Sequence, residues 1–172
     1  MSHPNGPSPA ATRPRRLRLS VLLLAGAATL ALSGCSPVVP MDPAVDASSP
    51  DCAAVVVRLP DAIAKDTEAE QPKRETNAQG TGAWGSPASV FLSCGVPAPG
   101  PTTDRCVTVN GVDWVIDESD APNYYFTTYG RTPAVRVLVN NDVVSGTTAI
   151  TELSGAVSVI PAEGACTTTP AD

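Results

Sequence analysis

Alternating apolar and polar positions dominate the middle of the chain and predict β-strands there. From Val107 to Ile116 the alternation runs through the dipeptide Asn110-Gly111. Asn-Gly is the preferred pair for a two-residue type I′ turn, because both turn positions need a positive φ. The segment therefore predicts a hairpin, whose core face would carry Val107, Val109, Val112, Trp114 and Ile116 and whose pairs would be Val109 with Val112, Thr108 with Asp113 and Val107 with Trp114.

Three further segments show the same two-residue period. Val90, Leu92 and Cys94 alternate with other residues in 89–94, and strands are also expected at 124–128 and 134–139. In the last of these, three valines fall on one side: Val135, Val137 and Val139. The hairpin and these segments give about five strands.

Helical spacing appears at both ends of the strand region. Ser49-Pro50-Asp51 is typical of a helix start, since a capping serine, an early proline and an acid all favour the first turn. Near the C-terminus an amphipathic helix is expected over 147–160, with apolar positions three and four apart: Ile150, Leu153, Val157 and Ile160. The order predicts an α+β fold, an antiparallel β-sheet of about five strands with an N-terminal and a C-terminal helix packed on it.

The first 34 residues have the three parts of a lipoprotein signal peptide. Four arginines precede an apolar run from 21 to 32, which is shorter than the roughly 20 residues of a spanning helix. The run ends in Leu32-Ser33-Gly34-Cys35, which is similar to a bacterial lipobox. We therefore expect lipidation of Cys35, with an ordinary secreted protein as the alternative. The pair Arg15-Arg16 also occurs in signals for twin-arginine export. However, Arg18 stands at a position where that signal has an apolar residue, so we expect export by the general secretory route.

Composition divides the rest of the chain into a Pro-rich tether at 35–49 and a single extracytoplasmic α+β domain at 50–172, with a long polar loop at 61–82. The signal peptide holds four of the 11 basic residues and none of the 17 acids, which leaves 7 basic against 17 acidic residues, a net charge of −10. Such a charge is repelled by phosphate backbones, so no nucleic acid partner is expected. Membrane contact is expected through the N-terminal lipid.

Four cysteines follow Cys35, and an even number outside the cytoplasm favours two disulfides. Three pairings are open among Cys52, Cys94, Cys106 and Cys166. A structural metal site would need Cys-x-x-Cys or histidine spacing, which this part of the sequence lacks.

Several short segments resemble the actinobacterial lipoproteins of domain-of-unknown-function family 3515. They are Cys52–Pro60, Ala83–Pro87, Cys94–Val96, Asn110–Trp114 and Phe126–Arg131. The resemblance implies a secreted or lipid-anchored envelope protein and supplies no activity. Genes of this family often lie near a D-alanine–D-alanine ligase gene, which implies a link to the cell wall. The resemblance also pairs Cys52 with Cys94, and hence Cys106 with Cys166.

The sequence contains few candidates for catalytic residues. The one histidine, His3, lies in the signal peptide, so histidine-based nucleophile systems and zinc sites are not expected after its removal. No catalytic, cofactor or metal residues are expected, and Asp117-Glu118-Ser119-Asp120 is interpreted as surface acidity rather than a calcium loop. A pair of carboxylates would suffice for a glycosidase, which is the alternative class.

A small set of polar and aromatic residues is left as candidates for binding. For Asp113 and Arg131 we favour side-chain hydrogen bonds that hold turns over contact with a ligand. Aromatic side chains with a few polar groups suit a glycan or peptide, although a core role is the stronger expectation for Trp84, Tyr125 and Tyr129.

The sequence as a whole predicts a lipid-anchored protein on the outer face of the cell membrane. We expect a non-enzymatic envelope accessory or binding module with cell-wall or envelope proteins as partners. A small carboxylate-dependent cell-wall hydrolase or transferase is the alternative. A solute-binding lipoprotein is disfavoured, because the chain is too short for two lobes around a ligand.

Overall fold

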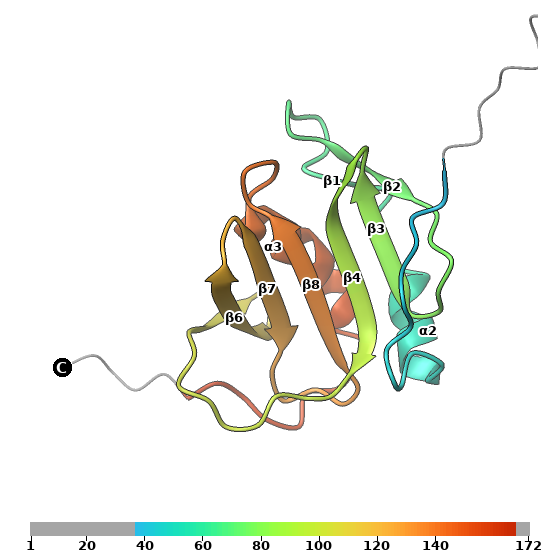
Figure 1. Ribbon diagram of the computed structural model, residues 1–172. Coiled ribbons are helices and arrows are strands. Elements are labelled where there is room, and N and C mark those ends of the chain that lie inside the picture. Colours follow the sequence, from blue (N-terminus) through green and yellow to red (C-terminus); the bar gives the residue numbers. More distant parts are fainter. Residues whose placement is uncertain (1–36, 168–172) are drawn as a thin grey trace, which may run out of the picture. The chain divides into compact units, whose positions relative to one another are not determined.

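The fold is α+β, with one antiparallel sheet of eight strands and two helices (Figure 1). The computed structural model describes residues 37–167. The sheet order is β1-β2-β3-β4-β8-β7-β6-β5. The strands are β1 (Ala62–Ile63), β2 (Gln71–Arg74), β3 (Thr81–Gly85), β4 (Ala88–Val96), β5 (Cys106–Val109), β6 (Val112–Asp120), β7 (Asn123–Thr128) and β8 (Ala134–Asn140).

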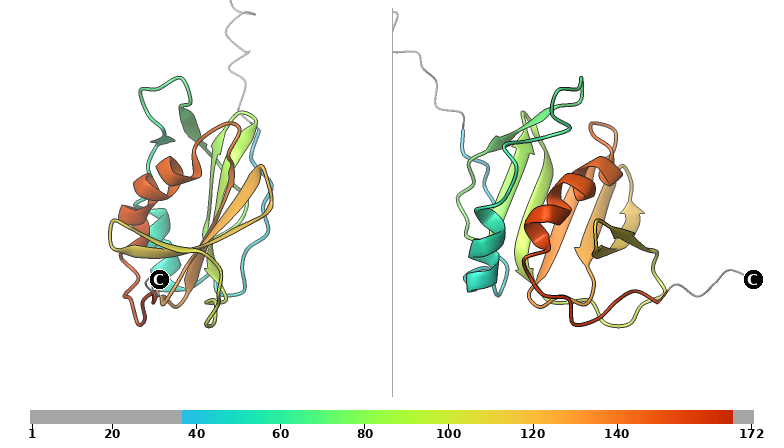
Figure 2. Two further views of the ribbon diagram at one scale, coloured as in Figure 1. Left: turned by 90° about the vertical axis from the view of Figure 1, so that its left-hand side faces the viewer. Right: turned by 180° about the vertical axis from the view of Figure 1, so that it is seen from behind.

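Both helices, α2 (Pro50–Val56) and α3 (Gly146–Val157), cover the same face of the sheet (Figure 2). Between helices and sheet lies one apolar cluster, which includes Val55, Leu92, Trp114, Val137 and Leu153, all with no exposed surface. Burial of this cluster supplies the main driving force of folding. Within residues 37–167, neither helix is long and apolar enough to cross a membrane.

The helix signals of the sequence are confirmed. The Ser49 hydroxyl accepts a hydrogen bond from the amide of Cys52 at 3.1 Å and caps α2. In α3 the apolar stripe faces the sheet as expected, although the helix ends at Val157 and Ile160 is buried just beyond it. The cap of α3 comes from Asn141, whose side-chain oxygen accepts from the amide of Gly146 at 2.9 Å.

The Asn110-Gly111 hairpin has the predicted register. Asn110 has a φ of 49° and Gly111 a φ of 76°, as a type I′ turn requires. The pairs are Val109 with Val112, Thr108 with Asp113 and Val107 with Trp114. Val112 and Trp114 have no exposed surface, so the predicted face does lie in the core.

The prediction of about five strands is an undercount, because the segment expected as a loop at 61–82 contains β1, β2 and the start of β3. Ile63 is fully buried, and the carboxylate of Glu152 on α3 accepts from the amide of Ala64 at 3.1 and 3.2 Å. Strands of two and four residues are too short to show a period in the sequence. Every residue of β3 is buried, so it shows no alternation either. Exposed residues of the segment lie in 65–70 and again between 72 and 79.

The N-terminal segment, residues 37–49, is not the free tether that its prolines predicted. Val39 is buried, forms a parallel bridge with Thr76, and donates from its amide to the carbonyl of Glu75 at 2.8 Å. Farther along, the amide of Asp46 donates to the carbonyl of Gly95 at 3.0 Å. Because these bonds fix the backbone to the sheet, residues 37–49 belong to the folded domain. Proline pre-sets an extended backbone that suits edge pairing as well as a linker.

Two disulfides join distant parts of the fold, Cys52–Cys94 between α2 and β4 and Cys106–Cys166 between β5 and the C-terminal segment. Both pairings are those implied by the family resemblance. The first lies in the core, and both of its residues are fully buried.

Candidate functional site

The face of the sheet opposite the helices, called here the open face, carries the other half of each alternating strand. One row across neighbouring strands joins Phe91, Leu138, Tyr125 and Asp117. The next row joins Ser93, Arg136, Thr127 and Val115. No helix covers these residues (Figure 2), so this face offers a surface for a ligand.

A polar pocket of about 420 Å³ lies on the open face over β6, β7 and β8. Its floor is formed by alternate residues of these strands, and its wall by the chain that follows β4. It is lined by Pro97, Pro99, Asp104, Val115, Asp117, Tyr125, Thr127 and Arg136. A ring, a guanidinium, a hydroxyl and two carboxylates therefore converge on one hollow, as in small-ligand sites.

Arg136 supplies the positive charge of the polar pocket. Its Nε donates to the hydroxyl of Thr127 at 3.3 Å, and its side chain is exposed. Within residues 37–167 its two terminal nitrogens donate to no protein group, so they are free to bind a carboxylate or phosphate in a forked geometry.

Asp117 supplies a negative charge to the same pocket. Hydrogen bonds from the side chain and the backbone amide of Ser119, together with the charge of Arg136, lower the pKa of Asp117 below its ordinary value of 3.8. Such bonds favour the charged form of a carboxylate. Asp117 is therefore ionised at neutral pH and does not have the raised pKa of a general acid.

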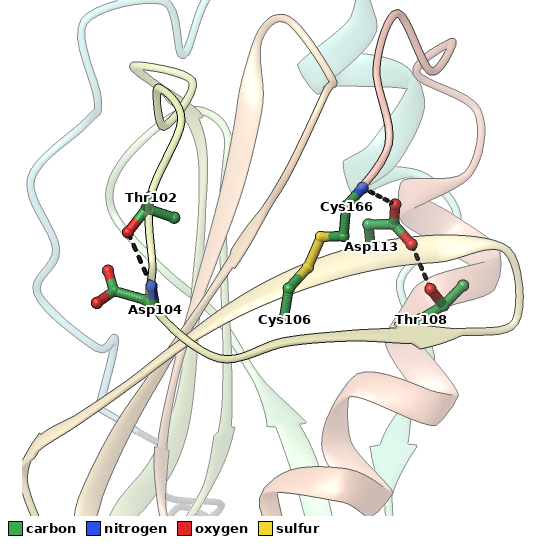
Figure 3. Close-up of a disulfide and its surroundings, with 6 residues drawn as sticks. All are labelled: Thr102, Asp104, Cys106, Thr108, Asp113 and Cys166. Atoms are coloured by element: carbon green, nitrogen blue, oxygen red, sulfur yellow. Dashed lines mark hydrogen bonds between the residues drawn. A yellow bond between two sulfur atoms is a disulfide. The ribbon is translucent and has the colours of Figure 1, made fainter. Parts of the chain in front are cut away.

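Asp113, a predicted binding candidate, acts instead as a structural acceptor (Figure 3). One carboxylate oxygen accepts from the hydroxyl of Thr108 at 2.6 Å, and the other accepts from the amide of Cys166 at 2.7 Å. These bonds tie the C-terminal segment to the hairpin beside the Cys106–Cys166 disulfide. The favoured interpretation, in which Asp113 holds local structure, agrees with this geometry.

Arg131 is also structural. It is 5% exposed, and it donates to the carbonyl of Ile160 and, at 2.9 Å, to that of Gly111. One guanidinium therefore joins the hairpin turn to the chain that leaves α3. Burial with both partners on the backbone leaves Arg131 no access to a ligand.

The three aromatic candidates have different positions. Trp84 is fully buried in the core and donates from Nε1 to the carbonyl of Pro60 at 2.9 Å. Tyr125 lines the polar pocket on the open face. Tyr129 lines a separate hollow of about 520 Å³ beside the Cys106–Cys166 disulfide. The structure therefore does not bring the predicted candidates together, and of these only Tyr125 belongs to the polar pocket.

The acidic run from Asp117 to Asp120 forms the exposed end of β6. Because side chains alternate along a strand, Asp117 and Glu118 point to opposite faces. Glu118 pairs with Arg105 at 3.2 Å and Asp120 accepts from Asn123 at 3.4 Å. In the part of the chain that the structure describes, no group of three or more His, Cys, Asp or Glu side chains is placed to hold a metal ion.

A second hollow on the open face, called here the N-terminal groove, has a volume of about 680 Å³. It lies between the N-terminal segment and the start of β4. Its walls are mainly apolar, and they include Pro37, Val38, Pro40, Pro87, Ala88 and Phe91.

The sequence analysis missed Arg136 and Thr127 in the polar pocket. A signal was present, because Arg136 interrupts the valines of β8 and must point away from the core face that they define. The closing prolines, Pro97 and Pro99, gave no signal, since nothing local places the chain after β4 over β6 and β7. Lipidation at Cys35 lies outside the described residues.

The family model for "Protein of unknown function (DUF3515)" matches residues 17–165. The chain therefore belongs to this family. No curated protein and no solved structure matches the chain at a significant level.

Proposed function

We propose that this chain is an actinobacterial envelope lipoprotein, anchored through Cys35 on the outer face of the cell membrane, whose open face binds a partner or ligand without chemical conversion. The arginines and apolar run of the predicted signal peptide, and the lipobox-like segment that ends at Cys35, support export and anchoring. The two disulfides suit an oxidising compartment.

The observation that carries the binding role is the free fork of Arg136, which lines the polar pocket together with Tyr125 and Pro99. A charge-assisted, bidentate contact at such a position gives both affinity and orientation. An anionic group of the cell wall, or an acidic side chain of an envelope protein, fits this chemistry.

Crosslinking from intact membranes tests the binding role. Arg136→Met removes the fork but keeps the length of the side chain, and Arg58→Met is the matched control at an exposed position just after α2. Partners of the cell-wall machinery captured by the wild type and by Arg58→Met, but lost with Arg136→Met, support the proposal. Equal capture by all three variants contradicts it.

Anchoring has its own test, because Cys35→Ala removes the proposed lipidation site and changes no residue of 37–167. The unaltered protein is expected in the detergent-soluble membrane fraction, and the Cys35→Ala protein is expected to be released or left unprocessed. Unchanged partitioning of the variant contradicts the lipid anchor.

A small cell-wall hydrolase is the second candidate, because the carboxylates of Asp104 and Asp117 line the same pocket. A pair of carboxylates is the minimum for glycoside hydrolysis. Because the pKa of Asp117 is lowered, Asp117 fits the ionised member of such a pair rather than the proton donor. Release of sugar reducing ends from purified wall by the wild type, and not by Asp117→Asn, would establish this alternative.

A further inference from the structure

The N-terminal groove lies where the described chain begins, two residues after Cys35. Its rim includes Val38, which keeps 53% of its surface exposed. Burial of a valine side chain is worth about 1.5 kcal/mol or more, so an exposed valine on an apolar groove favours contact with an apolar partner. Prolines and Phe91 form much of the remaining surface.

Both walls of the groove are held in place by Arg74. Its Nη2 donates to the carbonyl of Pro37 at 2.7 Å, and its Nη1 donates to the carbonyl of Gly85 at 2.8 Å. The bond between Val39 and Glu75 fixes the same segment to β2. The chain next to Cys35 is thus part of the folded domain.

Chain geometry then limits how far the groove can be from the lipid. Consecutive Cα atoms are 3.8 Å apart, so the Cα atoms of Cys35 and Pro37 are within about 8 Å of each other. Under the proposed lipid anchor, acyl chains on Cys35 would insert in the bilayer and bring Pro37 and the groove to the depth of the headgroups. A free tether of 15 residues would have removed this restriction.

We propose that the N-terminal groove docks onto the outer leaflet of the membrane, and that this contact orients the domain. The inference rests on the proposed lipid anchor. Apolar surfaces at an interface insert about 5–10 Å into the boundary between headgroups and acyl chains. Val38 and the ring of Pro87, both exposed, provide such a surface.

The orientation has a consequence for the polar pocket. The groove includes Ala88 at the start of β4, and Pro97 and Pro99 follow the end of this nine-residue strand. A strand of this length spans about 27 Å. If the docked domain holds β4 with its far end away from the membrane, the prolines that close the polar pocket lie up to this distance from the lipid, on the side of the cell wall.

Photocrosslinking of the full lipoprotein, reconstituted in vesicles of phosphatidylcholine and phosphatidylglycerol, tests the docking. A photoreactive benzophenone amino acid is placed at Ser86, on the groove, or at Thr103, beyond the far end of β4; both positions are exposed. Phospholipid adducts are expected several-fold more often at Ser86 than at Thr103. Equal yields, or adducts at Ser86 to a second copy or to another protein, would overturn the proposal.

Two valines of the N-terminal segment provide a matched pair of variants. Val38 lies in the groove, whereas Val45 is 78% exposed and lies outside it. Val38→Glu is expected to reduce lipid adducts at Ser86, and Val45→Glu to leave them unchanged. Equal effects of the two variants would overturn the docking. If the lipoprotein never partitions with membranes, the anchor itself fails; if it partitions without lipid adducts at Ser86, only the docking fails.

Discussion

The guanidinium of Arg131 donates a hydrogen bond to the carbonyl of Gly111 at 2.9 Å and so joins a buried cation to the tip of the hairpin. The same guanidinium also donates to the carbonyl of Ile160, just beyond α3. Arg131 follows β7 in the sequence, and both partners are backbone groups. One side chain thus connects the hairpin, the chain after β7 and the chain after α3.

Replacement of this side chain is expected to destabilise the fold. Arg131→Met keeps a similar length but leaves the two carbonyls without their donor, and loss of a partner for a buried polar group costs about 1–3 kcal/mol. We expect the free energy of unfolding in urea to fall by about 2 kcal/mol. Arg58→Met, at an exposed position on the helix side, is the control and should change it by less than about 0.5 kcal/mol. A loss for Arg131→Met no larger than for the control would show that these bonds are not structural.

Substitution of Gly111 is expected to destabilise the fold through backbone strain alone, without a steric clash. A side chain at Gly111 or at Gly100 would meet no atom within 4 Å, but Gly111 alone of the two has a positive φ. Gly111→Val should therefore cost more than about 1 kcal/mol through strain, and Gly100→Val should cost less. The change in melting temperature measures both.

A register slip in the same variant has a spectroscopic signature. If the hairpin moves by one residue, Trp114 turns out of the core and its emission shifts to longer wavelength. Trp84→Phe removes the other tryptophan as background. An unchanged melting temperature together with unchanged Trp114 emission would contradict the turn as described.

The disulfides are expected to be fully formed in the exported protein. Mass mapping without reduction should recover Cys52 linked to Cys94 and Cys106 linked to Cys166. In the chain-entropy model, closing loops with separations of 42 and 60 residues stabilises the fold by about 4 kcal/mol each.

Loss of the second disulfide should have a local effect as well. In the double variant Cys106→Ser/Cys166→Ser, amide exchange of residues 161–167 is expected to rise more than that of the sheet, because only hydrogen bonds such as those to Asp113 and from Glu163 to Gly130 then hold this described segment. A free thiol at Cys52 in the wild-type protein would contradict the pairing.

Asp117 should titrate below its ordinary pKa of 3.8, which carboxylate chemical shifts in NMR measure. The folded-state pKa is lower than the unfolded one. The associated stability is therefore present at neutral pH and is lost as the pH falls from about 3.8 through the folded-state pKa. Ser119→Ala removes the largest cause and should raise the pKa of Asp117. The same pKa in Ser119→Ala and in the wild type would contradict this assignment.

Local patterns in the sequence determined the elements whose residues interact with near neighbours. The Asn110-Gly111 dipeptide sets its own turn, Ser49 caps α2 three residues away, and the stripe of α3 repeats with the helical period. The alternation in β4 and β8 likewise defined their core faces, because a half-buried strand shows its burial directly in the sequence.

Only the tertiary structure decided the features that depend on distant contacts. β1 and β2 are too short to show a period, and β3 is buried on both faces, so pairing with neighbours rather than local pattern makes them strands. The prolines of the N-terminal segment are compatible with a free tether or with a chain bound to the edge of the sheet. The hydrogen bonds of Val39 and Arg74 show that the chain is bound to the edge. The polar pocket exists because the chain after β4 crosses β8, β7 and β6, which brings Pro97 beside Arg136 from 39 positions away in the sequence.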